Sequence, residues 1–315
     1  MLSNILVTGS VAFDFIMDFP GTFADNIDPK KVHILNISFL VNTLKKEKGG
    51  TAGNIAYSLA LLKTNPLIQA AVGDDFDEYL QYLRSSGVDT SQIKVISSES
   101  TSSAFITTDL KDNQIAAFYP GAMKYNKNFK IKSLPRKPIF VVISPNDPKA
   151  FMNFTKQSKV LKIPYMFDPG MQLPRLTNKD LKQGLTGAEI LIGNDYEIGM
   201  LKKRLSISTK EILNSVKVLI TTLGSKGSMI ETNNGKIIIL AAKPRKVVDP
   251  TGAGDGFRAG FITGYLKGLN LQTCGQMGSI SSCYVVEKYG TTNHTFSLAQ
   301  FCKRYKDNFG EDLKI

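Results

Sequence analysis

The stretch Val247–Phe261 reads VVDPTGAGDGFRAGF and places four glycines around one carboxylate, Asp255. Glycine costs helix stability and chain entropy, so such a cluster needs a reason. The pattern predicts a strand at 246–249 that ends at Asp249, followed by a helix whose first turn holds Asp255. The first amides of a helix are unpaired and carry the positive end of its dipole, and glycines let these amides approach a phosphate closely. The stretch therefore predicts a phosphate site.

Asp255 itself does not suit simple phosphate binding, because a carboxylate repels a phosphate. A carboxylate in this place suits a reaction in which it accepts the proton of an attacking hydroxyl. For this stretch alone, the alternative is a purely structural role, in which Asp255 is a first-turn acid favoured by the helix dipole and the glycines serve packing.

Two common phosphate loops do not fit the chain. A P-loop requires G-x-x-x-x-G-K-[ST], which neither this stretch nor TTLGSKGS (221–228) contains. The segment GDGFRA (254–259) fits the dinucleotide pattern G-x-G-x-x-G/A, but it lies near the end of the chain, and no acidic residue follows Asp255 before Glu287. The sequence therefore gives no support to NAD binding.

Strands and helices alternate through most of the chain, which predicts a mainly parallel sheet covered on both faces. The predicted strands are 4–11, 66–73, 138–144, 164–168, 189–193 and 217–224. Two segments, at about 15–48 and 102–120, instead contain short alternating pieces, such as 31–39 and a hairpin turning at Asp112-Asn113, and predict a small β lid. We expect residues 1–315 to form one α/β domain with this lid.

The composition excludes several classes of protein. The chain has 315 residues and a net charge of +12, but its lysines are dispersed, which favours solvated helix faces over a nucleic-acid arm. Three cysteines and two histidines without ligand spacing argue against zinc and against a disulfide framework. The apolar N-terminal segment has no basic region and is interrupted by Asp14 and Asp18. We expect a cytoplasmic protein with neither nucleic acid nor a membrane as partner.

Four motifs in order closely resemble the ribokinase/PfkB family of carbohydrate and nucleoside kinases. They are GGTAGNIAYSLALL (49–62), NDYE (194–197), TTLGSKG (221–227) and DPTGAGDGFRAGF (249–261). The resemblance covers nearly the whole chain. It implies a ribokinase-like three-layer α/β/α fold with a small β lid, and transfer of a phosphoryl group from MgATP to a hydroxyl.

The resemblance implies that Asp255 is the general base. It implies that Gly252, Ala253 and Gly254 form an amide anion hole for the charge on the transferred phosphoryl group. Donors of this kind lower a barrier by about 3–4 kcal/mol each. Because phosphoryl transfer has a loose transition state, alignment and charge neutralisation matter more than a strong base.

On the nucleotide side, the resemblance places Thr222, Gly224 and Gly227 along ATP and Asn194 near its phosphates. Glu197 would help to hold Mg²⁺ through water. N-x-x-E at a helix start is also a capping box, and both roles are compatible. A simple hairpin turn is the alternative reading of residues 222–227.

On the acceptor side, the resemblance implies that Asp14 binds ring hydroxyls of a sugar. Gly49 and Gly50 would let the backbone approach the sugar, and Asn54 would hydrogen-bond it. The structural alternatives are a buried partner for Asp14 and a turn with a helix start for the glycines.

A weaker likeness concerns a cation. Asp249 and Thr251, with the loop 288–292, resemble the monovalent-cation (K⁺) site of some family members.

The acceptor is the more open question. The predicted lid is rich in aromatic residues, which offer faces for a purine or form a small core of their own. The segments 38–62 and 113–123 also resemble members grouped with adenosine kinases. We expect adenosine, phosphorylated on its 5′-hydroxyl, with a sugar kinase as the alternative and a non-catalytic nucleic-acid-binding regulator as the alternative of another class. The sequence leaves monomer and homodimer open.

Overall fold

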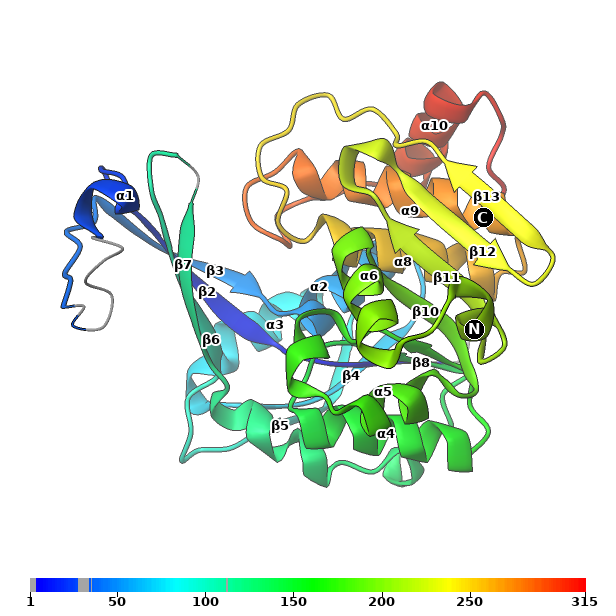
Figure 1. The fold of residues 1–315 in the computed structure, drawn as a ribbon, viewed down its shortest axis with the longest axis horizontal. Helices are drawn as coiled ribbons and strands as arrows, with labels where there is room; N and C mark the ends of the chain where they lie inside the picture. Colours follow the sequence, from blue (N-terminus) through cyan, green and yellow to red (C-terminus); the bar gives the residue numbers. More distant parts are fainter. Residues whose placement is uncertain (1–3, 28–33, 35, 112) are drawn as a thin grey trace.

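The computed structural model describes residues 4–27, 34, 36–111 and 113–315. Within these residues, nine strands form one sheet in the order β13-β12-β11-β10-β9-β8-β1-β4-β5 (Figure 1). Their bounds are β1 (Ile5–Thr8), β4 (Pro66–Val72), β5 (Asp89–Val95), β8 (Phe140–Ile143), β9 (Tyr165–Phe167), β10 (Ala188–Asn194), β11 (Val216–Thr222), β12 (Ser228–Thr232) and β13 (Gly235–Ile239). All neighbours pair in parallel except β11 with β12 and β12 with β13. The predicted, mainly parallel sheet is confirmed.

Both faces of this sheet are buried, because alternate residues of each strand face opposite layers. In β1, Ile5 and Val7 belong to one core and Leu6 to the other. The first core is covered by α2 (Thr51–Leu61), α3 (Asp77–Ser85), α8 (Ala253–Leu266), α9 (Leu271–Val286) and α10 (Leu298–Phe309). The second is covered by α4 (Pro148–Val160), α5 (Asn178–Leu185), α6 (Asp195–Leu205) and α7 (Thr209–Leu213). The three-layer α/β/α class is therefore confirmed.

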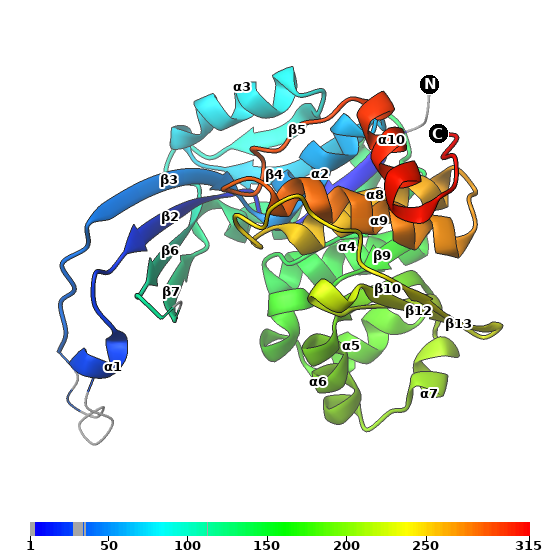
Figure 2. The ribbon, with the colours of Figure 1, turned by 90° about the horizontal axis from the view of Figure 1, so that it is seen from above.

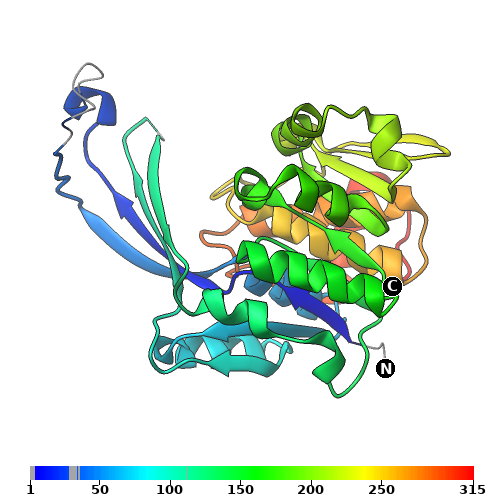
Figure 3. The ribbon, with the colours of Figure 1, turned by 60° about the horizontal axis from the view of Figure 1, so that its bottom comes forward.

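A second sheet projects from one side of this body as an arm (Figures 1 and 3). It contains β2 (Ala12–Asp18), β3 (Thr43–Gly49), β6 (Ser102–Thr108) and β7 (Gln114–Tyr119), in the order β3-β2-β6-β7. These strands come from the two segments predicted to form the lid. The predicted strand at 31–39 is wrong for its described residues, 34 and 36–39, which are not in a strand; residues 31–33 and 35, and Asp112 of the predicted turn, lie outside the described residues.

The remaining elements are short. They are α1 (Phe23–Asn26) near the tip of the arm and the 3-10 helices η2 (Asp74–Phe76), η3 (Gly121–Asn128), η4 (Ile131–Ser133), η5 (Gly170–Arg175) and η6 (Gly224–Lys226). No helix in the described part of the chain is both long and apolar enough to cross a membrane.

The predicted strand at 246–249 is also wrong. The amides of Val248 and Asp249 both donate to the carbonyl of Val286 at the end of α9, so this segment follows a helix and not the sheet. No place beside β11 is free, because β10 and β12 already pair with its two edges. The segment pairs with no strand and bends at Val248, and Val247 is exposed.

Helices α8 and α9 lie side by side in close contact (Figure 2). Glycines make this possible: a Cβ on Gly260 would lie 2.4 Å from the carbonyl oxygen of Met277. The helix that carries Asp255 is thus pressed against α9 through backbone, and its position is set by that contact.

We predict that Gly260→Ala lowers the free energy of unfolding by about 1–3 kcal/mol, because a backbone atom cannot move aside as a side chain can. The matched control is Gly199→Ala in the exposed face of α6, where an added Cβ meets nothing within 4 Å. This change should raise stability by about 0.5–1 kcal/mol through helix propensity alone. Urea unfolding of both variants measures the difference; equal effects would contradict the packing argument.

Candidate active site

The predicted site residues gather where parallel strands of the large sheet end. In open α/β sheets this edge is where ligands bind. Asn194 ends β10 and Thr222 ends β11, while Asp168 directly follows β9. The N-terminus of α8 brings Asp255 to the same edge, where its charge interacts with those of Asp168 and Glu197.

Asp255 occupies the first turn of α8, as predicted. Gly252 is the N-cap, in the left-handed region with φ of 78°, which favours glycine. The amide of Ala253 donates to the carbonyl of Pro250 at 3.2 Å. Among the described residues, the amides of Gly252 and Gly254 have no hydrogen-bond partner. Two of the three amides predicted to face an anion are therefore free to do so.

The carboxylate of Asp255 is held from a different helix. Asn54 in α2 donates from Nδ2 to Oδ2 of Asp255 at 2.8 Å, and its own Oδ1 accepts from the hydroxyl of Thr291 at 2.7 Å. The role of Thr291 in orienting the Asn54 amide could not be found from the sequence, because 237 positions separate the two residues. The Asn54 contact fixes the orientation of the carboxylate.

Burial raises the pKa of Asp255 from 3.8 to about 6. The neighbouring Arg258 and the hydrogen bond from Asn54 act in the opposite direction, and Asp168 and Glu197 reinforce the rise. A carboxyl with this pKa is ionised at neutral pH and accepts a proton more readily than an ordinary aspartate.

Arg258 and Asp168 form a buried ion pair that the sequence analysis missed. Nε of Arg258 lies 2.5 Å from Oδ2 of Asp168, and Nη2 lies 2.8 Å from Oδ1. A signal was present, since an arginine between Phe257 and Ala259 in an apolar helix requires a buried partner. Gly254 leaves room for this guanidinium, because a Cβ there would lie 2.7 Å from Nη1.

Asp14 in β2 faces the same region from the lid. Burial raises its pKa to about 7, and the charges of Asp255, Asp249 and Glu47 add to the rise. Gly49 is required beside it, because a Cβ on Gly49 would lie 2.2 Å from Oδ2 of Asp14. The structure thus brings Asp14, Gly49 and Asn54 toward Asp255.

Gly50 connects the lid to α2. It is the N-cap of α2 with φ of 85°, and a Cβ there would lie 2.6 Å from the carbonyl oxygen of Ser10. Gly50 makes the turn after which Asn54 lies one helical turn further along α2.

Asn194 and Glu197 form the capping box at the start of α6. Oδ1 of Asn194 accepts from the amide of Glu197, and Oε2 of Glu197 accepts from the amide of Asn194, both at 2.8 Å. Burial raises the pKa of Glu197. The described residues contain no group of three acidic, histidine or cysteine side chains that could hold a metal.

These residues fit Mg²⁺ of the kind that is held mainly by substrate phosphates and water with one carboxylate. Oε1 of Glu197 has no hydrogen-bond partner among the described residues and is the available ligand atom.

The turn after β11 is built by two glycines. Gly224 has φ of 58°, and Gly227 has φ of 94° with a hypothetical Cβ 2.0 Å from the carbonyl oxygen of Ile239. Thr222 precedes this turn at the end of β11. The hairpin reading of 222–227 is thereby confirmed as structure, while contact with ATP stays a prediction.

Asp249 joins two loops. Its Oδ1 accepts from the amide of Thr251 at 2.9 Å and its Oδ2 accepts from the amide of Gly290 at 3.0 Å. Both carboxylate oxygens therefore already have a structural role, and a cation site here stays a prediction.

We predict that Arg258→Met lowers the free energy of unfolding by about 3–5 kcal/mol, because Asp168 is left buried without its partner. The double variant Asp168→Asn/Arg258→Met should recover most of this loss, since no uncompensated charge remains. Denaturant unfolding of the single and double variants measures the recovery; a double variant less stable than Arg258→Met would contradict this account.

The comparisons with known proteins agree with this geometry. A model of the pfkB family of carbohydrate kinases matches residues 4–297. The nucleoside kinase of Methanothermobacter thermautotrophicus is 32% identical over 319 aligned positions, which cover 99% of this chain and 98% of that protein.

Solved structures agree over the same length. The nucleoside kinase of Burkholderia thailandensis in complex with inosine is similar with a TM-score of 0.90 and 32% identity, over 99% of this chain and 100% of that one. The same kinase in complex with ADP-inosine is similar with a TM-score of 0.88 and 33% identity, over 98% and 97% of the two chains. This chain belongs to the pfkB family of carbohydrate kinases and has its ribokinase-like fold.

Proposed function

We propose that this protein is an ATP-dependent nucleoside kinase that phosphorylates the 5′-hydroxyl of a purine nucleoside, adenosine above others. The observation that carries the proposal is the buried Asp255, oriented by Asn54 beside the free amides of Gly252 and Gly254. The inosine and ADP-inosine complexes of the Burkholderia thailandensis kinase support the substrate class.

In this proposal, Asp255 accepts the proton of the attacking hydroxyl. The amides of Gly252 and Gly254 donate to the oxygens of the transferred phosphoryl group, whose charge they help to neutralise. Arg258 lies one turn along α8, and its positive charge lowers the pKa of Asp255 and so favours the ionised carboxylate, against the charges of Asp168 and Glu197, which raise this pKa.

The nucleotide would lie along the edge made by β10 and β11. Asn194 would lie near its phosphates, with Thr222, Gly224 and Gly227 along its length. MgATP would supply the phosphoryl group and a cation that neutralises its charge, and Oε1 of Glu197 would help to hold that cation through water. Asp249 and Thr251 are proposed to contribute to a K⁺ site only through the loop that they form with Gly290.

The lid supplies the argument for a nucleoside. Phe19, Phe23 and Phe39 pack on one another, and Phe13 packs on Phe76, so these rings form small cores of their own. The remaining aromatic residues must be sorted by the face of the lid sheet on which they lie.

The register of the lid strands shows on which face of the lid sheet each remaining aromatic residue lies. Asp14 pairs with Ala104, and Ala104 pairs with Phe118, so Phe118 lies on the face that carries Asp14. Phe105 pairs with Phe15 on the opposite face and stacks on it at 5.0 Å. Phe118 is therefore the exposed aromatic ring on the substrate side, suited to contact a purine, while Asp14, Gly49, Gly50 and Asn54 surround the ribose.

We predict that Asp255→Asn lowers kcat by at least about a hundredfold, because the proton acceptor is lost. The variant is isosteric and its Oδ1 can still accept from Asn54, so the thermal midpoint and ATP affinity should change little. Steady-state kinetics with calorimetric ATP titration measures both; a turnover near that of the wild type would remove Asp255 as the base.

We predict that kcat/KM falls as pH drops below 7, because Asp14 (pKa about 7) and then Asp255 (pKa about 6) take up protons. The ionised form of Asp255 accepts the proton and that of Asp14 accepts ribose hydroxyls, so the logarithmic slope should approach two below pH 6. In Asp14→Asn the slope should be one. A rate that is flat from pH 8 to 5 would contradict the assignment.

We predict that Phe118→Ala raises KM for adenosine at least about tenfold, through lost stacking on the base, while KM for ATP stays unchanged. The matched control is Phe105→Ala, which is similarly exposed (42% against 39%) but lies on the other face. Kinetics with adenosine, inosine, ribose and fructose 6-phosphate tests the substrate class at the same time. Turnover of the sugars without the nucleosides would favour the sugar-kinase alternative.

A further inference from the structure

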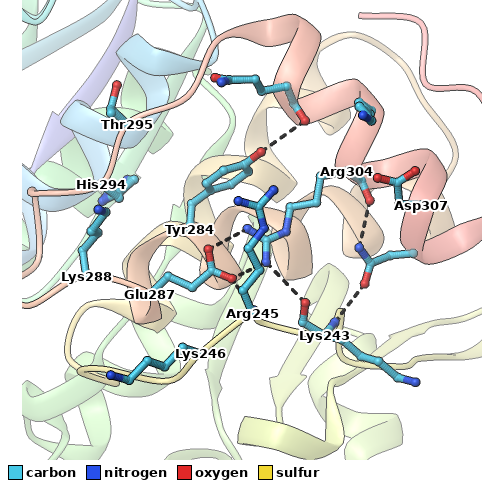
Figure 4. A pocket seen from close by; sticks show the side chains of 13 residues that line it. Lys243, Arg245, Lys246, Tyr284, Glu287, Lys288, His294, Thr295, Arg304 and Asp307 are labelled. Carbon is cyan, nitrogen blue, oxygen red and sulfur yellow. Dashed lines mark hydrogen bonds and ion pairs between the residues drawn. The ribbon is translucent and has the colours of Figure 1, made fainter.

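A cavity lies beneath α10, and none of the residues proposed to bind the substrates or to catalyse the reaction lines it (Figure 4). Its walls are the segment 243–246, the end of α9 and one face of α10, and its volume is about 750 Å³. This volume is within the range of small-molecule sites, which is roughly 300–1,000 Å³. We call it the α10 pocket.

Positive charge dominates this pocket. Six cationic side chains line it, with two carboxylates, Glu287 and Asp307: Lys243, Arg245, Lys246, Lys288, Lys303 and Arg304. Only Arg304 has an ion-pair partner among the described residues, the carboxylate of Glu287, which also accepts from the amide of Arg245. Five cations thus line one cavity without a carboxylate at ion-pair distance, although the charge of Arg245 also acts on Glu287, and this excess of positive charge attracts an anion of several charges.

The floor of the pocket is rigid. The guanidinium of Arg304 lies over the ring of Tyr284 at 4.6 Å, and it donates to Glu287 and to the carbonyl of Lys243. Tyr284 in turn donates to the carbonyl of Gln300. Figure 4 shows Tyr284 and Glu287 from the end of α9, Arg304 from α10 and Arg245 from the segment 243–246 lying close together. A charged surface held in this way loses little freedom when it binds a ligand.

A buried polar atom at this cavity also lacks a partner. His294 lines the pocket with 1% of its surface exposed, and its Nδ1 has no hydrogen bond among the described residues. Its Nε2 is engaged with the hydroxyl of Ser58 at 3.2 Å. Unpaired buried polar groups are rare and costly, so Nδ1 of His294 marks an unsatisfied polar position in the wall of the pocket.

We propose that the α10 pocket binds a small compound that carries phosphate or polyphosphate, at a site separate from Asp255, and that its occupancy is coupled to that site. The concave, bounded shape favours a small anion over the backbone of a nucleic acid, which needs an extended basic surface. Arg245 adds a planar fork that suits phosphate oxygens.

The coupling follows from the chain itself. The segment 243–246 leads directly into Asp249 and the glycines before α8. The end of α9 leads into Gly290, whose amide is bound by Asp249, and into Thr291, which orients Asn54. Ligand that tightens either wall of the pocket therefore acts on the loops that hold Asp255.

A second basic cavity offers a matched control. It has a volume of about 700 Å³ and is lined by Lys127, Lys130, Lys132 and Lys156, and it contains no arginine or histidine. None of its lining residues belongs to the loops beside Asp255.

The test is calorimetric titration of the full chain with pyrophosphate in Mg²⁺-free buffer without nucleotide, in which two triple variants separate binding at the α10 pocket from binding elsewhere. We expect one pyrophosphate to bind the wild type. Binding should weaken at least about tenfold in the α10-pocket variant, Lys243→Gln/Arg245→Gln/Lys303→Gln. It should weaken less than about twofold in the control variant, Lys127→Gln/Lys132→Gln/Lys156→Gln, which loses the same number of charges. Inorganic phosphate and AMP, titrated in parallel, distinguish a free phosphate from a nucleotide as the ligand.

Hydrogen exchange tests the coupling without relying on the proposed reaction. Pyrophosphate should slow exchange at 245–254 and 286–294 in the wild type and leave both segments unchanged in the α10-pocket variant. Absence of binding, equal weakening in both triple variants, or binding of a random oligonucleotide in place of pyrophosphate would overturn the site. Binding that leaves exchange in these segments unchanged would overturn the coupling.

Discussion

The burial of one carboxylate, Asp255, is the constraint on which the arrangement of this molecule depends. A charge in the first turn of a helix and away from water needs a donor, and Asn54 supplies it from α2. Asn54 is oriented in turn by Thr291, which lies beyond the end of α9. The carboxylate is therefore positioned only when α2, α8 and the loop after α9 are packed together, which is what the close glycine contacts between α8 and α9 provide.

The charges around Asp255 determine its raised pKa. Asp168 and Glu197 lie near enough to raise its pKa, and Arg258 opposes them. Arg258 is the guanidinium at the centre of this cluster and is itself neutralised by Asp168, so the net field stays negative. Asp14 adds a further carboxylate from the lid. A site with this much negative charge is suited to accept hydrogen bonds from hydroxyl groups and to attract a metal cation.

The parts of the site with a local cause could be predicted from sequence. The glycines before Asp255 and the N-x-x-E spacing at Asn194 each predict the start of a helix. Both helices, α8 and α6, begin there in the structure. The pair between Arg258 and Asp168 spans 90 positions, and no local pattern contains it. The strand expected at 246–249 was wrong for a similar reason: its residues suit a strand, but the amides of Val248 and Asp249 donate to the carbonyl of Val286 at the end of α9, far away in the sequence. The α10 pocket could not be predicted from the sequence, because its lysines and arginines are dispersed along the chain and come together only in the fold.

The central claim is that Asp255 is ionised at neutral pH and yet takes up a proton far more readily than an ordinary aspartate. Carboxyl carbon NMR of the ¹³C-aspartate-labelled protein measures this directly, with Asp255→Asn to assign the signal. A resonance that titrates near pH 6 and disappears in the variant is the predicted result. A resonance for Asp255 that titrates near pH 4, as in an exposed aspartate, would contradict the account.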